Sequence, residues 1–295
     1  MQAGRTTPAG DFDYDQFGRG YSQLRRTEPR IAAMVHAALG NARTVVNVGA
    51  GAGSYEPRDR YVVAIEPSAA MRAQRPREIA PAIDGVAERL PLDDGSVDAA
   101  MSTLSVHQWQ DWRRGLRELR RVSRGPVVVM TFDGDEINRF WLAEYCPEVI
   151  AAEHGRFPPI AEIAAVLGGR TRVQKVPIPI DCVDGFTEAY YARPAAFLDA
   201  RVRGSQSAWG FVSAEVQERF VRELTAEIEN GEWERKHGHL RSEPVFWGAL
   251  RLIVSEPWGA HPKHRDEDIS VAWASPGSSA QQGPPPRTRK NDSMS

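Results

Sequence analysis

Three glycines at alternate positions form the stretch of this chain that is best suited to binding a ligand. Gly49, Gly51 and Gly53 directly follow Thr44 to Val48, a β-branched apolar run short enough to be a buried parallel strand. Glycines at a strand end allow the backbone to lie directly against a bound molecule. The spacing therefore predicts a ligand-binding loop.

A second apolar run ends in an acid. Tyr61 to Ile65 has the composition of a neighbouring strand and is followed at once by Glu66. Adjacent parallel strands present their ends at the same sheet edge, which is where ligands bind in open α/β sheets. A carboxylate there can accept hydrogen bonds from both hydroxyls of a ribose. The plain alternative is a glycine turn beside an ordinary surface Glu.

His107 is the candidate for acid–base chemistry. It follows the fourth predicted strand, at the same sheet edge, and an imidazole titrates in the range that suits a general base. It would act as a base or contact the substrate; the alternative is that it only hydrogen-bonds the loop before the helix near Trp109. His237 and His239 lack a third ligand at suitable spacing, so no metal site is predicted.

Helices and strands alternate around these residues. Apolar positions recurring every three or four residues predict helices over 28–39, 68–75 and 109–122, and apolar runs predict strands over 83–86, 97–102 and 127–132. Between the first two strands, Pro57 leaves room for little more than the start of a helix. Five strands alternating with helices predict an α/β fold with a doubly wound, mainly parallel sheet.

The second half is less regular. It predicts helices over 136–153, 160–167 and 214–229 and strands over 171–180 and 245–254. Segment 184–240, which precedes the last strand and is rich in aromatic residues, is expected to form a helical cap over the sheet edge. Its aromatic side chains either shape a substrate pocket or are plain core.

The chain is expected to divide into three parts. Residues 1–28 mix aromatic, acidic and glycine residues and are predicted to form an N-terminal lid, in which Tyr14, Tyr21 and Arg25 either reach the site or pack on the surface. Residues 29–258 form the main domain. Residues 259–295 are predicted to be a disordered tail, because their composition cannot bury enough apolar surface to offset the ordering entropy.

Composition argues against several classes of partner. The chain has 295 residues, of which 41% are hydrophobic, and a net charge of −2, so no basic field gathers nucleic acid or an anionic membrane. No apolar run approaches the roughly 18 residues of a membrane span, and residues 1–20 contain no signal-peptide core. The only cysteines, Cys146 and Cys182, fit a reducing compartment. We expect a cytoplasmic protein with a small, nearly neutral substrate; the sequence does not indicate an oligomeric state.

Five ordered blocks of sequence carry a resemblance to a known family. They are Asn47 to Gly53, Glu66-Pro67-Ser68, Ala87 to Pro91, Asp98, and His107-Gln108-Trp109. Over residues 14 to 135 they resemble the class I S-adenosylmethionine-dependent methyltransferases, and within these the small-molecule type 11 group. The resemblance implies a Rossmann-like, seven-stranded sheet with its last strand antiparallel. It also implies S-adenosyl-L-methionine as cofactor and direct in-line methyl transfer to a small organic acceptor.

The contacts to the cofactor are likewise implied by the resemblance. The glycines would pass under its methionine and ribose parts, Glu66 would hold the ribose hydroxyls with Pro67 beside it in the cofactor site, and Ala87 with Glu88 would flank adenine. Residues near Leu104 and Ser105 would close over the sulfonium side. Asn47 stands where the family has an acid and can still accept a hydrogen bond from the cofactor amino group. Val86 replaces another usual acid, which shifts the contact with the adenine amino group to Glu88 or to backbone.

Two other functions fit part of the same pattern. An NAD(P)-dependent oxidoreductase also places glycines after a first strand and an acid after a second, but its Gly-x-Gly-x-x-Gly pattern puts the third glycine one place later than here. The chain also contains no Tyr-x-x-x-Lys pair. A cofactor-binding regulator or partner subunit without catalysis stays open, because fold alone does not fix function.

Overall fold

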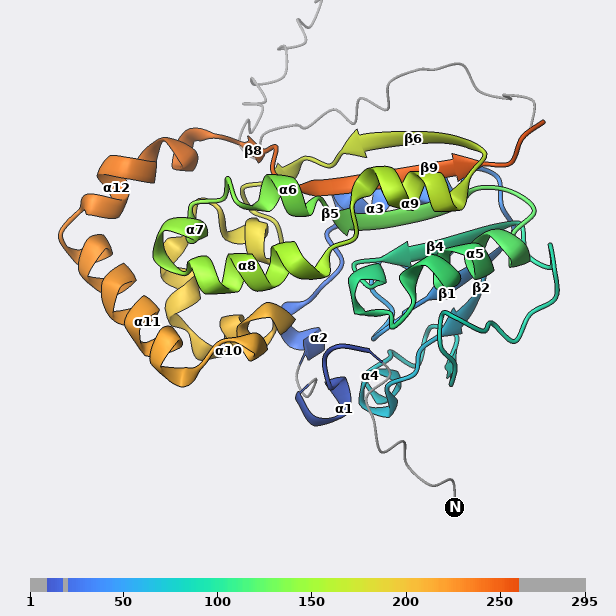
Figure 1. Ribbon diagram of the computed structural model, residues 1–295, viewed down its shortest axis with the longest axis horizontal. Coiled ribbons are helices and arrows are strands. Elements are labelled where there is room, and N and C mark those ends of the chain that lie inside the picture. The colour runs from blue at the N-terminus through green and yellow to red at the C-terminus, as the bar shows by residue number, and fades with distance from the viewer. Residues whose placement is uncertain (1–9, 18–20, 260–295) are drawn as a thin grey trace, which may run out of the picture.

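A seven-stranded sheet forms the centre of the molecule (Figure 1). The computed structural model describes residues 10–17 and 21–259. The strand order is β3-β2-β1-β4-β5-β9-β6, in which β9 runs antiparallel to both neighbours and the first five strands run parallel. The strands are β1 Thr44–Val48, β2 Tyr61–Ile65, β3 Ala82–Ile83, β4 Ala99–Thr103, β5 Val127–Phe132, β6 Arg170–Lys175 and β9 Leu250–Glu256. The predicted sheet, with its reversed last strand, is confirmed.

Helices cover both faces of the sheet. On one face α3 (Pro29–Ala38) starts at a proline, is capped by the Glu28 carboxylate, and buries Ile31 and Val35 against β1 and β5. On the other face α5 (Trp112–Val122) and α9 (Ile160–Leu167) bury their leucines against the sheet. In Figure 1 the latter two helices lie in front of the sheet and α3 lies behind it.

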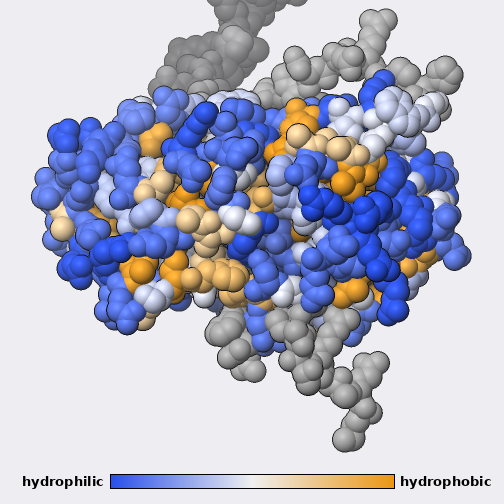
Figure 2. Space-filling model, viewed as in Figure 1, coloured by the Kyte–Doolittle hydropathy of each residue, from blue (hydrophilic) through white to orange (hydrophobic). Residues whose placement is uncertain are grey.

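A helical lobe extends from one end of the sheet (Figure 1). It contains α6 Gly134–Ile137, α7 Leu142–Tyr145, α8 Pro147–Arg156, α10 Ala200–Gly204, α11 Ala214–Glu229 and α12 Glu232–His237, with 3-10 turns at Thr187–Tyr190, Pro194–Leu198, Ser207–Phe211 and Gly238–Ser242. The remaining elements are α1 Tyr14–Phe17, α2 Tyr21–Leu24, α4 Ala69–Ala73, a 3-10 turn at Val106–Gln108, and the paired strands β7 Ile178–Pro179 and β8 Val245–Phe246. None of the helices within the described ranges combines the length and apolarity that crossing a bilayer requires. The face shown in Figure 2 is mostly hydrophilic, with its apolar side chains in separate patches.

Several predicted elements are shorter than expected. The helix over 136–153 is divided into α6, α7 and α8. The break before α8 comes at Pro147, which lacks an N–H and starts a new helix instead of continuing α7. The helix over 109–122 begins only at Trp112, since the Asp111 side chain accepts from the backbone N–H of Arg114 and caps it there. The crossover between β1 and β2 was predicted to hold little more than the start of a helix, and it contains none within the described residues.

The strand predicted over 245–254 is interrupted by a buried carboxylate. The backbone N–H of Ala249 donates to both carboxylate oxygens of Glu188, each at 2.9 Å. A Cβ on Gly248 would lie 2.4 Å from the same oxygens, so only glycine fits there. Burial raises the pKa of Glu188 to about 7. The chain therefore forms β8, bends around Glu188 and enters β9.

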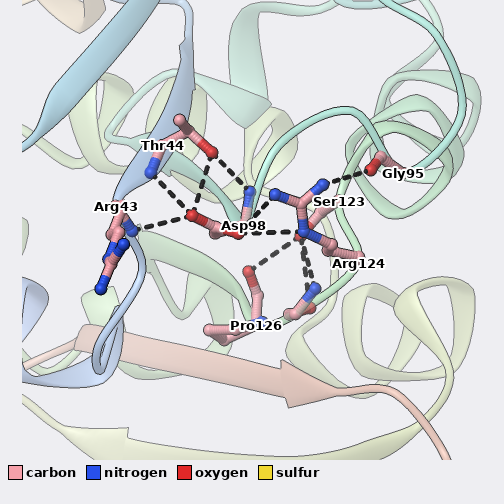
Figure 3. Close-up of polar contacts among 8 residues, drawn as sticks. Arg43, Thr44, Gly95, Asp98, Ser123, Arg124 and Pro126 are labelled. Atoms are coloured by element: carbon pink, nitrogen blue, oxygen red, sulfur yellow. Dashed lines mark hydrogen bonds and ion pairs between the residues drawn. The ribbon is translucent and has the colours of Figure 1, made fainter.

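Asp98 ties the starts of two neighbouring strands together (Figure 3). Its Oδ2 accepts from the backbone N–H groups of Arg43 and Thr44, both at 2.9 Å, and its Oδ1 accepts from the Arg124 guanidinium at 2.7 and 2.9 Å. These bonds, led by that from Thr44, lower the pKa of Asp98 to about 2. Asp98, part of the resemblance, thus lies at the opposite end of β1 from the glycine loop.

Candidate functional site

A cavity of about 210 Å³ lies at the carboxyl ends of β1, β2 and β4. Its lining comes from the loops after four strands and from the N-terminal segment. The lining residues are Gly49, Ala50, Gly51, Ala52, Ser54, Glu66, Pro67, Ser68, Met71, Gly85, Val86, Ala87, Glu88, Thr103, Leu104, Ser105, Gln108 and Trp109, with Gly10 and residues 12–15. This is the sheet edge at which the sequence predicted a ligand.

The glycine loop packs too closely for larger residues. Gly49 has φ +69°, and a Cβ there would lie 2.3 Å from the Oγ of Ser105. Ser105 cannot move away freely, because its hydroxyl bonds to the carbonyl oxygen of Val48 at 3.2 Å and to the Ser102 hydroxyl at 2.7 Å. Gly51 has φ +51°. Both glycines therefore expose bare backbone to the cavity.

Glu66 is held in place by backbone donors. Its Oε2 accepts from the N–H of Gly51 and its Oε1 from the N–H of Ser68, both at 2.8 Å. Each oxygen keeps capacity for a further donor. Burial raises the pKa of the Glu66 carboxyl above its ordinary value, while the two backbone bonds oppose that shift. The carboxylate is thus oriented at the cavity wall with acceptor positions in reserve.

Leu104 has a strained backbone at the cavity wall. Its φ is +54°, in the left-handed region that leucine rarely adopts. A backbone bond from its N–H to the carbonyl oxygen of Met130, at 2.8 Å, holds the turn. Such strain persists only where the surrounding structure maintains it, and strained residues are common at ligand sites. Ala87 and Glu88 also line the cavity, and the Glu88 carboxylate accepts from the backbone N–H of Asp111 at 3.0 Å.

Asn47 and Gly53 adjoin the cavity-lining residues of the glycine loop in sequence but are not themselves among the residues that line the cavity. Asn47 is buried and its Nδ2 donates to Glu56 at 3.0 Å, while its Oδ1 has no hydrogen-bond partner within the described part of the chain. Gly53 has φ +96°, and a Cβ there would lie 2.2 Å from the Cδ1 of Ile79. Gly53 therefore shapes the loop through packing.

The N-terminal segment lies against the cavity. Asp15 accepts from the Ser68 hydroxyl at 2.7 Å and from the backbone N–H of Ala70 at 2.9 Å, which fastens the segment to the start of α4. The Tyr14 hydroxyl accepts from the Gln108 amide at 2.8 Å. Of the two positions predicted for Tyr14, at the site or on the surface, the structure has it among the residues that line the cavity. Sequence reasoning expected Ser105 near the cofactor but assigned no separate role to Asp15 or Gln108, because their partners are distant in the chain.

His107 lies beside the cavity and is not among its lining residues. Its ring centroid is 4.6 Å from that of Phe157, its Nε2 is 3.2 Å from the Gln108 amide nitrogen, and its Nδ1 is enclosed without a hydrogen-bond partner in the described structure. The Gln108 amide nitrogen can donate to Nε2 in the tautomer whose proton is on Nδ1, and it also donates to the Tyr14 hydroxyl. Burial, then the charges of Arg156 and Arg25, lower the pKa of His107 well below its ordinary value.

The cap over 184–240 does not supply any of the described residues that line the cavity. Phe197, Trp209 and Trp233 are at most 2% exposed and belong to the apolar core of the helical lobe. For these three residues the core interpretation of the aromatic pattern is the one that the packing supports. The structure does not describe residues 1–9, 18–20 and 260–295, which include nearly all of the predicted tail. The side chain of Tyr21 also lies outside the description.

Comparison with known proteins adds three findings. The model of the "Methyltransferase domain" family matches residues 46–128. An uncharacterized methyltransferase of Mycobacterium tuberculosis is 40% identical over 91 residues, which are 28% of this chain and 36% of that protein. The chain thus spans about a third of the length of the curated relatives it matches.

Two solved structures extend the comparison over most of the chain. A protein of Anabaena variabilis, provisionally assigned as a methyltransferase from an antibiotic biosynthesis pathway, is 30% identical, with a TM-score of 0.74 over 79% of this chain and 99% of its own. A SAM-dependent methyltransferase of Thermotoga maritima, at 17% identity and a TM-score of 0.50 over 82% of this chain and 97% of its own, shares the fold. Together with the sheet order and the glycine loop, the Anabaena relative shows that the chain belongs to the class I S-adenosylmethionine-dependent methyltransferases.

Proposed function

We propose that this protein binds S-adenosyl-L-methionine in the cavity at the ends of β1, β2 and β4 and methylates a small organic acceptor by direct in-line transfer. One observation carries the proposal. The Glu66 carboxylate is held at the cavity wall by the N–H groups of Gly51 and Ser68, with acceptor capacity left for two ligand hydroxyls.

The residues around the cavity suit this cofactor. The bare backbone of Gly49 and Gly51 would accept its methionine and ribose parts without steric conflict, and Glu66 with Pro67 would hold the ribose. Ala87 and Glu88 would flank the adenine, and Leu104 would lie over the sulfonium side. The buried, unpaired Oδ1 of Asn47 is an acceptor that the cofactor's amino group could satisfy.

The chain's own residues have a positioning task. When bound, the cofactor supplies a methyl group already activated by its sulfonium. The protein must orient the acceptor, exclude water and, for a hydroxyl acceptor, remove a proton. The segment around Tyr14 and Asp15 would cover the site, and Leu104 would fix the wall nearest to the reacting atoms. His107 is proposed as the residue that takes a proton from, or hydrogen-bonds to, the acceptor.

A small organic acceptor is supported by two observations. The net charge of −2 provides no attraction for a nucleic acid. The Anabaena relative is provisionally assigned to an antibiotic biosynthesis pathway, which favours a small organic acceptor over a macromolecule. We therefore propose that neither nucleic acid nor membrane is the target.

Two measurements test the proposal in sequence. Calorimetry should show binding of S-adenosylmethionine and S-adenosylhomocysteine and none of NAD, and the reverse pattern would overturn it. A screen of small hydroxyl-, amine- and carbon-nucleophile acceptors with methyl-labelled cofactor should then give a labelled product, with Glu66→Ala as the negative control. Binding without any labelled product across the screen would favour the regulator without catalysis.

A further inference from the structure

A buried ion pair lies directly beneath the glycine loop. Arg75, which follows α4, and Glu56, in the crossover between β1 and β2, meet at 2.8 Å with side chains 3% and 2% exposed. A buried ion pair contributes little net stability compared with well-packed apolar residues. Its presence here is better explained by the orientation it imposes on its neighbours, a role that the family resemblance gives to neither Arg75 nor Glu56.

Every nitrogen of the Arg75 guanidinium has an acceptor. Nε and Nη2 lie 3.1 and 2.8 Å from the carbonyl oxygen of Ala80, and Nη2 also donates to Glu56. Nη1 lies 3.3 Å from the carbonyl oxygen of Gly51 and 3.5 Å from that of Ala50, both in residues that line the cavity. The rigid fork of one guanidinium therefore ties the glycine loop to the chain after α4.

Glu56 in turn fixes the amide of Asn47. The Nδ2 of Asn47 donates to Oε1 of Glu56 at 3.0 Å. A carboxylate only accepts hydrogen bonds, so the amide nitrogen must face Glu56 and the amide oxygen must face away. That oxygen is buried and unpaired in the described structure. An unpaired buried acceptor is unfavourable until a ligand brings it a donor.

We propose that Arg75 and Glu56 are positioning residues of the cofactor site, holding Asn47 and the glycine loop in the arrangement that receives the amino-acid end of the cofactor. Neither residue lines the cavity. They act through the amide of Asn47 and through the backbone of Ala50 and Gly51. This inference rests on the proposed binding of S-adenosylmethionine and deepens it.

Two ligands separate positioning from general stability. S-adenosylhomocysteine carries the amino-acid end, whereas 5′-methylthioadenosine lacks it and keeps the adenine, ribose and sulfur. For Glu56→Gln, which preserves shape but lets the amide of Asn47 turn, calorimetry should show S-adenosylhomocysteine binding weakened about tenfold or more, because a hydrogen bond to a charged amino group is lost. Binding of 5′-methylthioadenosine should stay within about threefold of the parent protein, since its contacts are retained.

Arg75 is tested in the Glu56→Gln background, so that removing it leaves no buried carboxylate without a partner. Arg75→Met with Glu56→Gln should show the same selective loss. Leu224→Ala, in the buried core of α11, is the matched control: it should lower the melting temperature and leave both dissociation constants unchanged. Parallel weakening of both ligands, or unchanged binding of S-adenosylhomocysteine, would overturn the positioning role. Failure of the parent protein to bind either ligand would instead remove the proposed function.

Discussion

Replacing Glu66 with Ala should weaken S-adenosylhomocysteine binding roughly tenfold to hundredfold. The carboxylate is oriented by the N–H groups of Gly51 and Ser68, both at 2.8 Å, so its remaining lone pairs are fixed toward the cavity. A hydrogen bond to a charged group contributes about 1.5–3 kcal/mol, and about 1.4 kcal/mol corresponds to tenfold in the dissociation constant. We assign the free energy of one such bond to the two ribose hydroxyls together, because water replaces part of the hydrogen bonding that Glu66→Ala removes.

The same substitution also acts on the ligand-free fold. It leaves the N–H groups of Gly51 and Ser68 without their protein acceptor. Each would cost about 1–3 kcal/mol in a closed interior, but water in the adjoining cavity can bond to both. We therefore expect a loss of about 1 kcal/mol in the free energy of unfolding, which corresponds to roughly 2–4 °C in melting temperature.

Calorimetry and ligand-free melting curves measure the two effects separately. Glu162→Gln is the control, because its carboxylate lies on the exposed face of α9, paired with Arg113, and it should change neither quantity. The reasoning fails if Glu66→Ala binds S-adenosylhomocysteine within twofold of the parent protein. A large loss of binding shared by the Glu162 control would mean that the assay reports damage to the fold.

Three further predictions follow from contacts at other positions. Gly49→Ala should weaken cofactor binding at least about tenfold and lower the melting temperature, because the added Cβ would collide with Ser105. Gly40→Ala is the control for backbone strain alone, since Gly40 has a similar φ of +56° and nothing lies within 4 Å of the added Cβ. This control should leave cofactor binding unchanged. With a hydroxyl acceptor, His107→Ala should lower turnover about a hundredfold or more. The rate of the parent protein should show no imidazole titration between about pH 6 and 8, because burial lowers the pKa of His107 and keeps the ring neutral there. Unchanged turnover in His107→Ala would remove this residue from the mechanism. Asp98 has a folded pKa of about 2 against an unfolded value of about 3.9, so it stabilises the fold above about pH 4 and loses that contribution as pH falls through 2. The difference in melting temperature between the parent and Asp98→Asn should therefore shrink over that pH range. A constant difference would contradict the lowered pKa of Asp98.

Local patterns were sufficient to predict the sheet and much of the cavity. The strand Thr44–Val48, the loop at Gly49 and Gly51, and the acid Glu66 lie within a short span of sequence and at one edge of the sheet, so topology alone brings them together. The short crossover was predictable from residue type, since Pro57 leaves room for little more than the start of a helix. The role of Glu66 in holding a cofactor stays a prediction.

Features set by distant partners were not predictable. The bend before β9 depends on the Glu188 carboxylate, which is far away in sequence from Ala249, so periodicity near residue 245 indicated one continuous strand. His107 has the position expected from its strand, yet its burial against Phe157 lowers a pKa that the sequence suggested would be ordinary. Arg75 and Glu56 gave no motif, because each acts only through contacts made in three dimensions.

The N-terminal segment contacts two parts of the molecule at once. Asp15 binds the start of α4, on the cofactor side, while Asp11, four residues earlier, pairs with Arg156 of α8 in the helical lobe. A ligand that displaces or tightens the segment at one of these contacts also changes the free energy of the other. Thermodynamic linkage makes such an effect mutual. If a bound acceptor changes the affinity for the cofactor by some factor, the bound cofactor changes the affinity for the acceptor by the same factor.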